Sequence, residues 1–245
     1  MSAGENRFQS PEPGRRIIIA IDGPAGAGKS TIARQLARHF GLLNLETGAM
    51  YRGFALKALR TGLALDESSG LEALAAETSI RLEPGEEENR VLLDGEDVTG
   101  LIRNPTVTEA ASRVSVFPRI RAWMVCLQQQ LGAQGGVVME GRDIGTVVFP
   151  HAEVKIFLDA APEVRGLRRY DQMGQLDQKG TAPPPDEIIR DLRARDERDR
   201  NRADSPLKPA QDSVILDSTN LTLDQAVSEA VSIVAGKLRP AELSS

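Results

Sequence analysis

The chain has 245 residues, of which 40% are apolar and 27% charged, and its formal net charge is −5. This length suits one medium α/β domain, or a domain with an insert. No apolar run approaches the ~20 residues that span a bilayer, which argues against a membrane protein. The acidic balance argues against a general nucleic-acid binder, because nucleic-acid phosphates would repel it. A single cysteine excludes an intrachain disulfide, and with only two histidines no zinc site is expected.

The two ends of the chain are expected to lie outside the folded part. Residues 1–15 are polar and contain proline, and they lack the apolar core of a secretory signal. We therefore expect a disordered leader on a cytoplasmic protein, and a frayed tail over residues 239–245. Because the sequence shows no apolar surface stripe that demands a partner, we also expect a monomer.

Apolar runs that alternate with helical patterns indicate the fold class. The first run, 17–22, ends at a glycine turn and suits a buried parallel strand. Further strands are expected at 42–46, 137–140, 154–159 and 213–218, and helices at 29–39, 48–60 and 222–237. The alternation predicts a five-stranded parallel sheet with helices on both faces.

Three segments depart from this alternation. Residues 62–104 contain short strand-like runs too close together for crossover helices, which predicts a small antiparallel β insert. A helix over 105–131 is expected to bend or break near Pro118. Residues 171–187 are rich in proline and predict a mobile lid loop, with Asp186 as a candidate N-cap of the next helix. The core is then expected over residues 16–61, 105–170 and 188–238.

The segment GPAGAGKS, residues 23–30 and here called the phosphate loop, matches G-x-x-x-x-G-K-[ST]. It lies between a predicted strand and a predicted helix, which is the context expected of a P-loop NTPase fold. Backbone N–H groups and the helix N-terminus form an anion cradle, Lys29 reaches the β- and γ-phosphates, and Ser30 binds the Mg²⁺ that bridges them. The expected triphosphate-binding residues are Gly23, Pro24, Ala25, Gly26, Ala27, Gly28, Lys29, Ser30 and Thr31.

Two further segments could build a second pocket. In LETGAMYR, Arg52 could grip an acceptor phosphate and Tyr51 could pack beside it, although Tyr51 also suits the edge of the core. EGRDIGT follows a predicted strand, at the end of the sheet where open parallel sheets bind ligands. Its Arg142 and Asp143 could bind a ligand or form a loop salt bridge.

The charged run RDLRARDERDRNR, residues 190–202, has two kinds of positions. On a helix that begins near Asp186, one face carries Ile188, Leu192, Arg195, Asp199 and Arg202. This face begins apolar and becomes charged, so we expect it to pack on the core and then point into a cleft. Arg190, Arg193 and Arg200 lie elsewhere on the helix and are expected at the surface, with Asp191, Asp196 and Glu197 as their partners.

The chain resembles the bacterial cytidylate kinases, which are P-loop nucleoside monophosphate kinases. The resemblance covers residues 16–236 and is carried in order by IDGPAGAGKST, ETGAMYR, DGEDVTGLIR, AASRVSVFPRIR, EGRDIGTVVFP, KIFLDA, RDERDRNR and LDST. It implies the reaction ATP + (d)CMP → ADP + (d)CDP with Mg²⁺, and an insert that helps to bind the nucleoside monophosphate. Glu46-Thr47 departs from the Asp or Ser often found in the family, and the lid segment is longer and richer in proline than expected.

The resemblance also implies a role for each matching residue. It implies catalytic roles for Lys29, Arg142, Arg195 and Arg198, and places Arg168, Arg169 and Arg198 on the lid side near ATP. It implies a CMP-binding set of Thr47, Tyr51, Arg52, Ser112, Arg121, Arg142, Asp143, Arg195, Asp199 and Arg202. In this set, Arg52, Arg142 and Arg195 would grip the phosphate, Ser112, Arg121, Asp143 and Arg202 would read cytosine, and Asp199 would contact the sugar.

Three other functions compete with this one. A kinase for another small acceptor, such as UMP or shikimate, would share the phosphate loop. A nucleic-acid-dependent ATPase would need a basic, aromatic-studded surface, which the acidic composition does not favour. A nucleotide-sensing scaffold would bind ATP without turnover, against which the intact Lys29-Ser30 pair argues. A GTPase would need N-K-x-D, which is absent.

Overall fold

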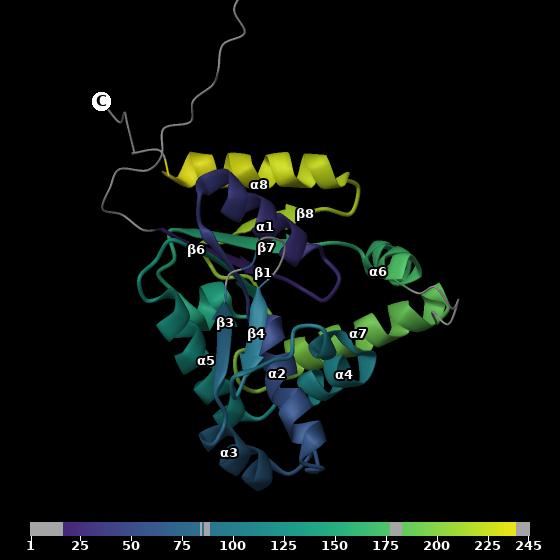
Figure 1. Cartoon of the computed structure of the whole chain (residues 1–245). Helices are drawn as coiled ribbons and strands as arrows, with labels where there is room; N and C mark the ends of the chain where they lie inside the picture. The colour runs from purple at the N-terminus through teal and green to yellow at the C-terminus, as the bar shows by residue number, and fades with distance from the viewer. Residues whose placement is uncertain (1–16, 84, 86–88, 177–182, 239–245) are drawn as a thin grey trace, which may run out of the picture.

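The core of the computed structural model is a five-stranded parallel sheet with the strand order β2-β6-β1-β7-β8 (Figure 1). The structure describes residues 17–83, 85, 89–176 and 183–238, so the predicted leader and tail lie outside the described residues. The strands are β1 (Ile18–Asp22), β2 (Leu43–Glu46), β6 (Val137–Gly141), β7 (Val154–Asp159) and β8 (Val214–Asp217). All neighbours pair in parallel, which confirms the predicted sheet.

Helices cover both faces of the sheet, because successive strand residues point to opposite sides. Ile19 and Ile21 of β1 pack beneath α1 (Lys29–Phe40) and α8 (Leu223–Leu238), whereas Ala20 between them belongs to the core on the other face. That second face is covered by α2 (Thr47–Arg60), α4 (Pro105–Val114) and α5 (Pro118–Gly132) (Figure 1). Proline begins both α4 and α5, so the predicted break near Pro118 is confirmed.

The predicted insert contains an antiparallel sheet in the order β3-β4-β5. Its strands are β3 (Ile80–Glu83), β4 (Arg90–Leu93) and β5 (Glu96–Asp97), and a short 3₁₀ turn follows at Leu101–Arg103. The insert also holds a helix, α3 (Ser68–Ala76), that the strand patterns did not predict. Val91 of β4 is buried in the same apolar cluster as Phe54 of α2, so the insert is packed onto the core. Its role in binding a nucleotide stays a prediction.

Helices α6 (Pro162–Leu176) and α7 (Pro185–Asn201) pack side by side and project from the main body (Figure 1). They pass close at Gly166, where a Cβ would lie 2.2 Å from Cγ1 of Ile189. The predicted loop over 171–187 is therefore helical at both ends, and its central residues 177–182 lie outside the described part. Asp186 is not the N-cap of α7: Pro184 holds that position and Asp186 lies in the first turn. No helix in the described ranges is long and apolar enough to cross a membrane.

Candidate active site

Acidic side chains stand at the carboxyl ends of the parallel strands, around the phosphate loop. β1 ends in Asp22, β7 in Asp159 and β8 in Asp217, and Glu140 is the penultimate residue of β6. This is the edge of an open parallel sheet at which ligands bind. The site therefore forms at the predicted end of the sheet.

The phosphate loop joins β1 to α1 in backbone conformations that favour glycine. Gly23 has a φ of 150°, and a Cβ there would lie 2.0 Å from the backbone oxygen of Leu158 in β7. Gly26 and Gly28 have φ values of 76° and 95°. Residues with a Cβ rarely adopt such torsions, so the glycines that the motif requires are required by the backbone as well.

Lys29 begins α1 and is buried, and its Nζ donates to the carbonyl oxygen of Pro24 at 2.6 Å. The pKa of Lys29 is lowered to about 7, first by burial and then by the positive charge of Arg142, with a smaller contribution from Arg195. A buried amine that faces other cations is electrostatically suited to a polyanion. Lys29 thus lies where a triphosphate would be stabilised most.

The Ser30 hydroxyl donates to Oε1 of Glu140 at 2.5 Å. Burial, and then the negative charge of Glu46, raises the pKa of Glu140. A divalent cation would offset this cost, and Mg²⁺ needs only one or two protein oxygens when phosphates complete its shell. The Ser30–Glu140 pair therefore fits an ATP-bound Mg²⁺. Glu140 was missed in the sequence, although an acid at the end of a strand beside β1 was a usable signal.

Asp22 anchors the segment that follows β6. Its carboxylate accepts from the N–H groups of Ile144 and Gly145, both at 2.7 Å. Burial raises the pKa of Asp22 to about 6, against the lowering effect of these two hydrogen bonds. The contact fixes the backbone immediately after Arg142 and Asp143, so Asp22 helps to position two of the predicted acceptor residues.

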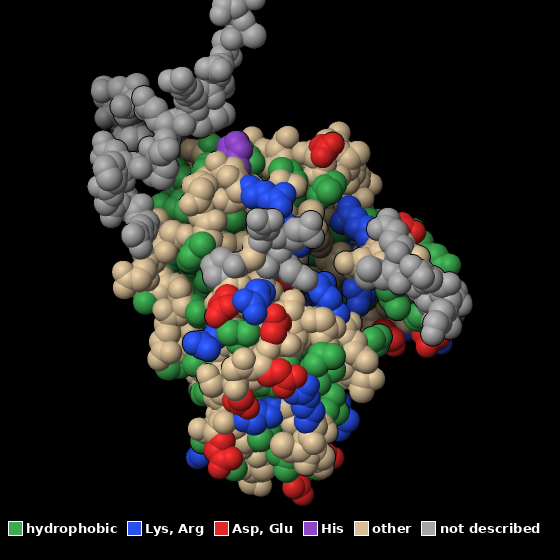
Figure 2. Space-filling view, in the orientation of Figure 1, with side chains coloured by type: hydrophobic (Ala, Val, Ile, Leu, Met, Phe, Trp, Pro, Cys, Tyr) green, Lys and Arg blue, Asp and Glu red, His purple; other side chains and the backbone are tan. Residues whose placement is uncertain are grey.

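The predicted acceptor residues meet beside the phosphate loop. Five of them form the arginine cluster, which comprises Arg52, Arg121, Arg142, Arg195 and Arg202. Nε of Arg142 donates to Asp199 at 2.8 Å, and Arg202 lies 3.6 Å from the other oxygen of the same carboxylate. In Figure 2, Lys and Arg side chains gather around the hollow between the main body and α6–α7.

Arg121 organises the far side of this cluster. It forms a buried ion pair with Asp143, donates to the backbone oxygen of Ser115 at 3.2 Å and lies 5.9 Å from the centre of the Tyr51 ring. The pKa of Tyr51 is raised to about 12, chiefly by burial. The structure therefore supports both interpretations of these residues: Asp143 forms a salt bridge and Tyr51 packs at the core, yet both face the cluster.

Thr47 and Ser112 add hydroxyl groups around the cluster. Oγ1 of Thr47, at the start of α2, donates to the backbone oxygen of Glu140 at 2.7 Å. Ser112 lies in α4 and is buried. Arg52 pairs with Glu46 at 2.5 Å.

Several buried donors in the cluster have no protein partner. Among the described residues, the buried side-chain atoms without a hydrogen bond include Ser112 Oγ, Arg52 Nε, Arg121 Nε, Arg195 Nε and Arg202 Nη2. Burial, and then the charge of Arg142, lowers the pKa of Arg195 to about 10. Because buried polar groups are normally satisfied, these donors indicate a ligand with several acceptor atoms.

The three residues expected on the lid side near ATP donate their hydrogen bonds to residues outside the arginine cluster. Arg198 instead reaches α4, where it pairs with Glu109 at 3.1 Å. Arg168 donates to Ser218 beyond β8, at 2.7 Å to its backbone oxygen, and Arg169 donates to Gln172 at 2.9 Å. The expectation that Asp196 is a surface partner is wrong, because Asp196 is buried and pairs with Arg165 at 2.6 Å.

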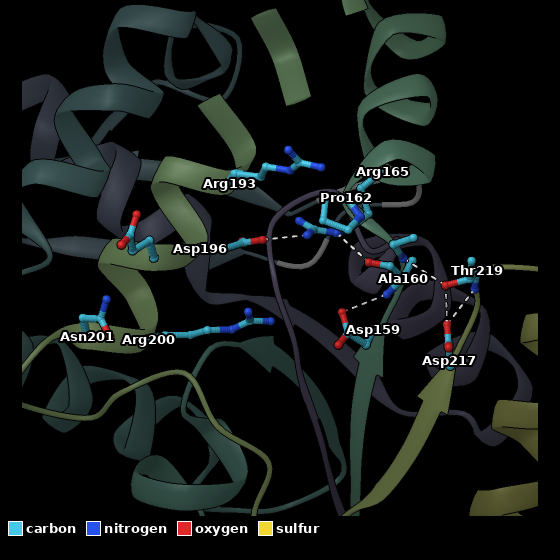
Figure 3. A pocket seen from close by; sticks show the side chains of 12 residues that line it. Asp159, Ala160, Pro162, Arg165, Arg193, Asp196, Arg200, Asn201, Asp217 and Thr219 are labelled. Atoms are coloured by element: carbon cyan, nitrogen blue, oxygen red, sulfur yellow. Dashed lines mark hydrogen bonds and ion pairs between the residues drawn. The ribbon is translucent and has the colours of Figure 1, made fainter. Parts of the chain in front are cut away.

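A cavity of about 530 Å³ lies next to the phosphate loop, beyond β7 and β8 (Figure 3). Its lining includes Asp159 and Pro162 on one side and Asp217 and Thr219 on another, with α7 across from them. The residues named here after β7 and β8 were not predicted from the sequence as part of a site.

Comparison with known proteins identifies the family. A family model described as cytidylate kinase matches residues 19–236. The chain belongs to the cytidylate kinase family. It is 46% identical over 219 residues to a cytidylate kinase from Pasteurella multocida, with 89% of this chain and 95% of that protein covered. It is 48% identical over 221 residues to one from Syntrophotalea carbinolica, with 90% and 93% covered.

Membership of the cytidylate kinase family confirms the resemblance seen in the sequence. Among solved structures, a shikimate kinase from Bacteroides thetaiotaomicron covers 91% of this chain and 99% of its own, with a TM-score of 0.48 and 14% identity. That likeness is too low to carry an argument about the acceptor.

Proposed function

We propose that the chain transfers the γ-phosphoryl group of ATP to CMP or dCMP, giving ADP and CDP or dCDP. The observation that carries the proposal is the meeting of two anion sites. The charges of Arg142 and Arg195, in the arginine cluster, act directly on Lys29 of the phosphate loop. Two bound nucleotides would therefore present their phosphates to one shared positive field. Family membership supports CMP as the acceptor.

On the donor side, residues 23–31 hold the phosphates of ATP, and Lys29 neutralises the β- and γ-phosphates. Ser30 and Glu140 hold Mg²⁺, which when bound screens the charge of the transferred group. Arg168 and Arg169 lie in α6 and contribute positive charge to the donor side.

On the acceptor side, Arg52, Arg142 and Arg195 bind the phosphate of CMP. The Arg121–Asp143 pair, with Ser112 and Arg202, reads the cytosine, because a guanidinium and a carboxylate offer both donor and acceptor atoms. Asp199 contacts the sugar, and Thr47 and Tyr51 complete the wall. Arg198 can take its catalytic role only if it leaves Glu109 and contacts the transferred phosphoryl group instead.

The transfer needs little covalent chemistry from the protein. A phosphate oxygen of CMP attacks the γ-phosphorus, and the bond from that phosphorus to the β–γ bridging oxygen breaks. The attacking oxygen is already anionic, so no general base is required. Catalysis rests on in-line positioning and charge neutralisation, for which arginine suits because its fork binds phosphate oxygens in pairs.

We propose further that the enzyme acts on free nucleotides as a cytoplasmic monomer and needs no nucleic acid. The acidic net charge of −5 supports the last point. Sedimentation at several protein concentrations tests the oligomeric state.

A screen of nucleoside monophosphates and shikimate with Mg²⁺ and ATP tests the acceptor. We expect ADP release with CMP and dCMP, and almost none with Lys29→Ala, because that variant loses the phosphate lysine. Preferred turnover of UMP or shikimate would overturn the assignment. ATP hydrolysis stimulated by RNA or DNA alone would instead favour a nucleic-acid-dependent ATPase.

A further inference from the structure

Arg165 of α6 and Asp196 of α7 form a buried ion pair outside the roles assigned above. Their side chains are only 2% and 6% exposed, and the carboxylate lies 2.6 Å from the guanidinium. Figure 3 shows the two side chains meeting between the helices. Arg165 also donates through Nε to the backbone oxygen of Ala160 at 2.8 Å, so its donors are used in three directions.

Both members of this pair also bond to one residue of the phosphate loop. Arg165 donates to the backbone oxygen of Ala25 at 2.8 Å, and the backbone N–H of Ala25 points to Asp196 at 3.4 Å. Gly26 follows, and a Cβ there would lie 3.3 Å from Cβ of Arg165. The backbone C=O and N–H groups of Ala25, in the first half of the phosphate loop, are thus both hydrogen-bonded to side chains from α6 and α7.

We propose that Arg165 and Asp196 are positioning residues that hold the first half of the phosphate loop in its phosphate-binding shape. They act through Ala25 and need no contact with ATP. This inference rests on the proposed donor role of the loop. The ion pair also links the phosphate loop to α7, in which Arg195, the residue before Asp196, belongs to the arginine cluster.

A test must separate positioning from simple stability. Removing one partner of a buried pair leaves an uncompensated charge, whereas replacing both with apolar residues is often neutral for folding. We therefore pair Asp196→Asn with the double variant Arg165→Met, Asp196→Leu. Asp196→Asn loses the ion pair but keeps the hydrogen bond from Arg165 to Ala25, whereas the double variant loses both contacts with Ala25 and leaves no buried charge behind.

The readout is binding of Mg-ATP, tripolyphosphate and CMP, each measured by calorimetry on the whole chain. Tripolyphosphate has no nucleoside, so it reports the phosphate loop alone. We expect about tenfold weaker binding of both ATP and tripolyphosphate, the effect of one lost charged hydrogen bond. CMP binding should stay within about twofold of wild type in the double variant, since Arg142 keeps its hydrogen bond to Asp199 and the loss of one positive and one negative charge leaves the net charge near Arg142 unchanged.

Glu163→Gln is the matched control, because Glu163 and Arg193 form an exposed ion pair between the same two helices. It should leave all three affinities unchanged. Unchanged tripolyphosphate affinity in a folded variant would overturn the proposal, and so would an equal loss of CMP affinity or a similar loss in the control. If neither variant folds, the pair is structural and the proposal fails. These bindings need no turnover, so failure of the kinase assignment would appear separately in the monophosphate screen.

Discussion

At the residue scale, the charged side chains of the site orient one another before a ligand binds. Asp199 accepts from Arg142 and lies beside Arg202, and Asp143 pairs with Arg121. Burial alone would raise the pKa of Asp199, but the combined positive charges of Arg142, Arg195 and Arg202 outweigh it and the pKa is lowered. Each carboxylate fixes a guanidinium, which reduces the ordering cost of binding a phosphate.

Arg142→Ala should raise the KM for CMP far more than the KM for ATP. The variant loses charge-assisted hydrogen bonds to the acceptor phosphate and leaves Asp199 short of a partner. We expect the KM for CMP to rise by about tenfold or more, with the KM for ATP within about twofold. Steady-state kinetics with each substrate varied in turn gives both constants.

Arg119→Ala is the control for that variant, because the side chain of Arg119 is 81% exposed on α5 and, among the described residues, forms an ion pair with Glu72. It should behave as wild type. Equal increases in both constants for Arg142→Ala would contradict the placement of Arg142 on the acceptor side.

ATP binding should be accompanied by proton uptake at Lys29. The pKa of Lys29 is lowered to about 7 by burial and by Arg142. Bound phosphates favour the charged amine and raise this pKa, so the complex holds more protons than the unliganded protein above about pH 7. Affinity for ATP should therefore fall as the pH rises through that range.

Calorimetry at about pH 8, in buffers of different ionisation enthalpy, measures this uptake. Lys29→Arg should abolish it, because arginine stays charged in both states. A wild-type protein that takes up no proton would show that Lys29 is already charged before ATP binds.

At the element scale, much of the fold could be predicted because the relevant signals are local. Five apolar runs with turn residues gave the five strands, and Pro118 gave the break between α4 and α5. The phosphate loop was recognisable because its glycines are required by its own backbone. The predicted extent of the lid loop, residues 171–187, was wrong, because α6 and α7 extend into both ends of it. The helical state of these residues depends on packing between α6 and α7.

The missed site residues share a different property: their partners lie far away in the sequence. Glu140 meets Ser30 across 110 positions, and Asp22 meets Ile144 across 122. Asp196 was expected at the surface because its helix is charged almost throughout. Only the approach of α6, which brings Arg165, makes that position buried, and no periodicity within α7 contains this information.

Gly166→Ala should destabilise the pairing of α6 and α7. The new Cβ would meet Ile189 at 2.2 Å, so the helices must separate or Ile189 must leave its rotamer. We expect a loss of about 1–3 kcal/mol in unfolding free energy, as for other overpacked contacts. Gly174→Ala, on the same helix with nothing within 4 Å, should instead stabilise by up to about 1 kcal/mol through helix propensity.

Denaturant unfolding of both variants measures the two changes. If Gly166→Ala were as stable as Gly174→Ala, the close approach of the helices would not be a feature of the protein in solution.

At the scale of the whole molecule, the fold brings the phosphate loop and the arginine cluster from separate parts of the chain to one edge of the sheet. The phosphate loop follows β1, whereas the arginine cluster draws on α2, α5, α7 and the segment after β6. An overall charge of −5 therefore coexists with a local gathering of arginines beside the phosphate loop (Figure 2). Low-dielectric walls strengthen such a local field, so the net charge does not keep nucleotides out.

This arrangement predicts the response to a ligand in which adenosine and cytidine are joined by five phosphates. If both sites open onto the same hollow, the linked ligand occupies them together, and the second contact gains from a high effective concentration. Because a ligand stabilises the state that it binds, the linked compound should raise the melting temperature more than ATP and CMP added together at equal concentration.

Arg142→Ala should reduce that shift to about the shift given by ATP alone, whereas Arg119→Ala should not change it. Both variants keep the phosphate loop intact, so a difference between them reports the contribution of the acceptor side alone. A linked ligand that stabilises the wild type no more than ATP does would mean that the two sites do not meet. The positive charges of Arg142 and Arg195 near Lys29 would then not suffice to hold the donor and acceptor phosphates side by side.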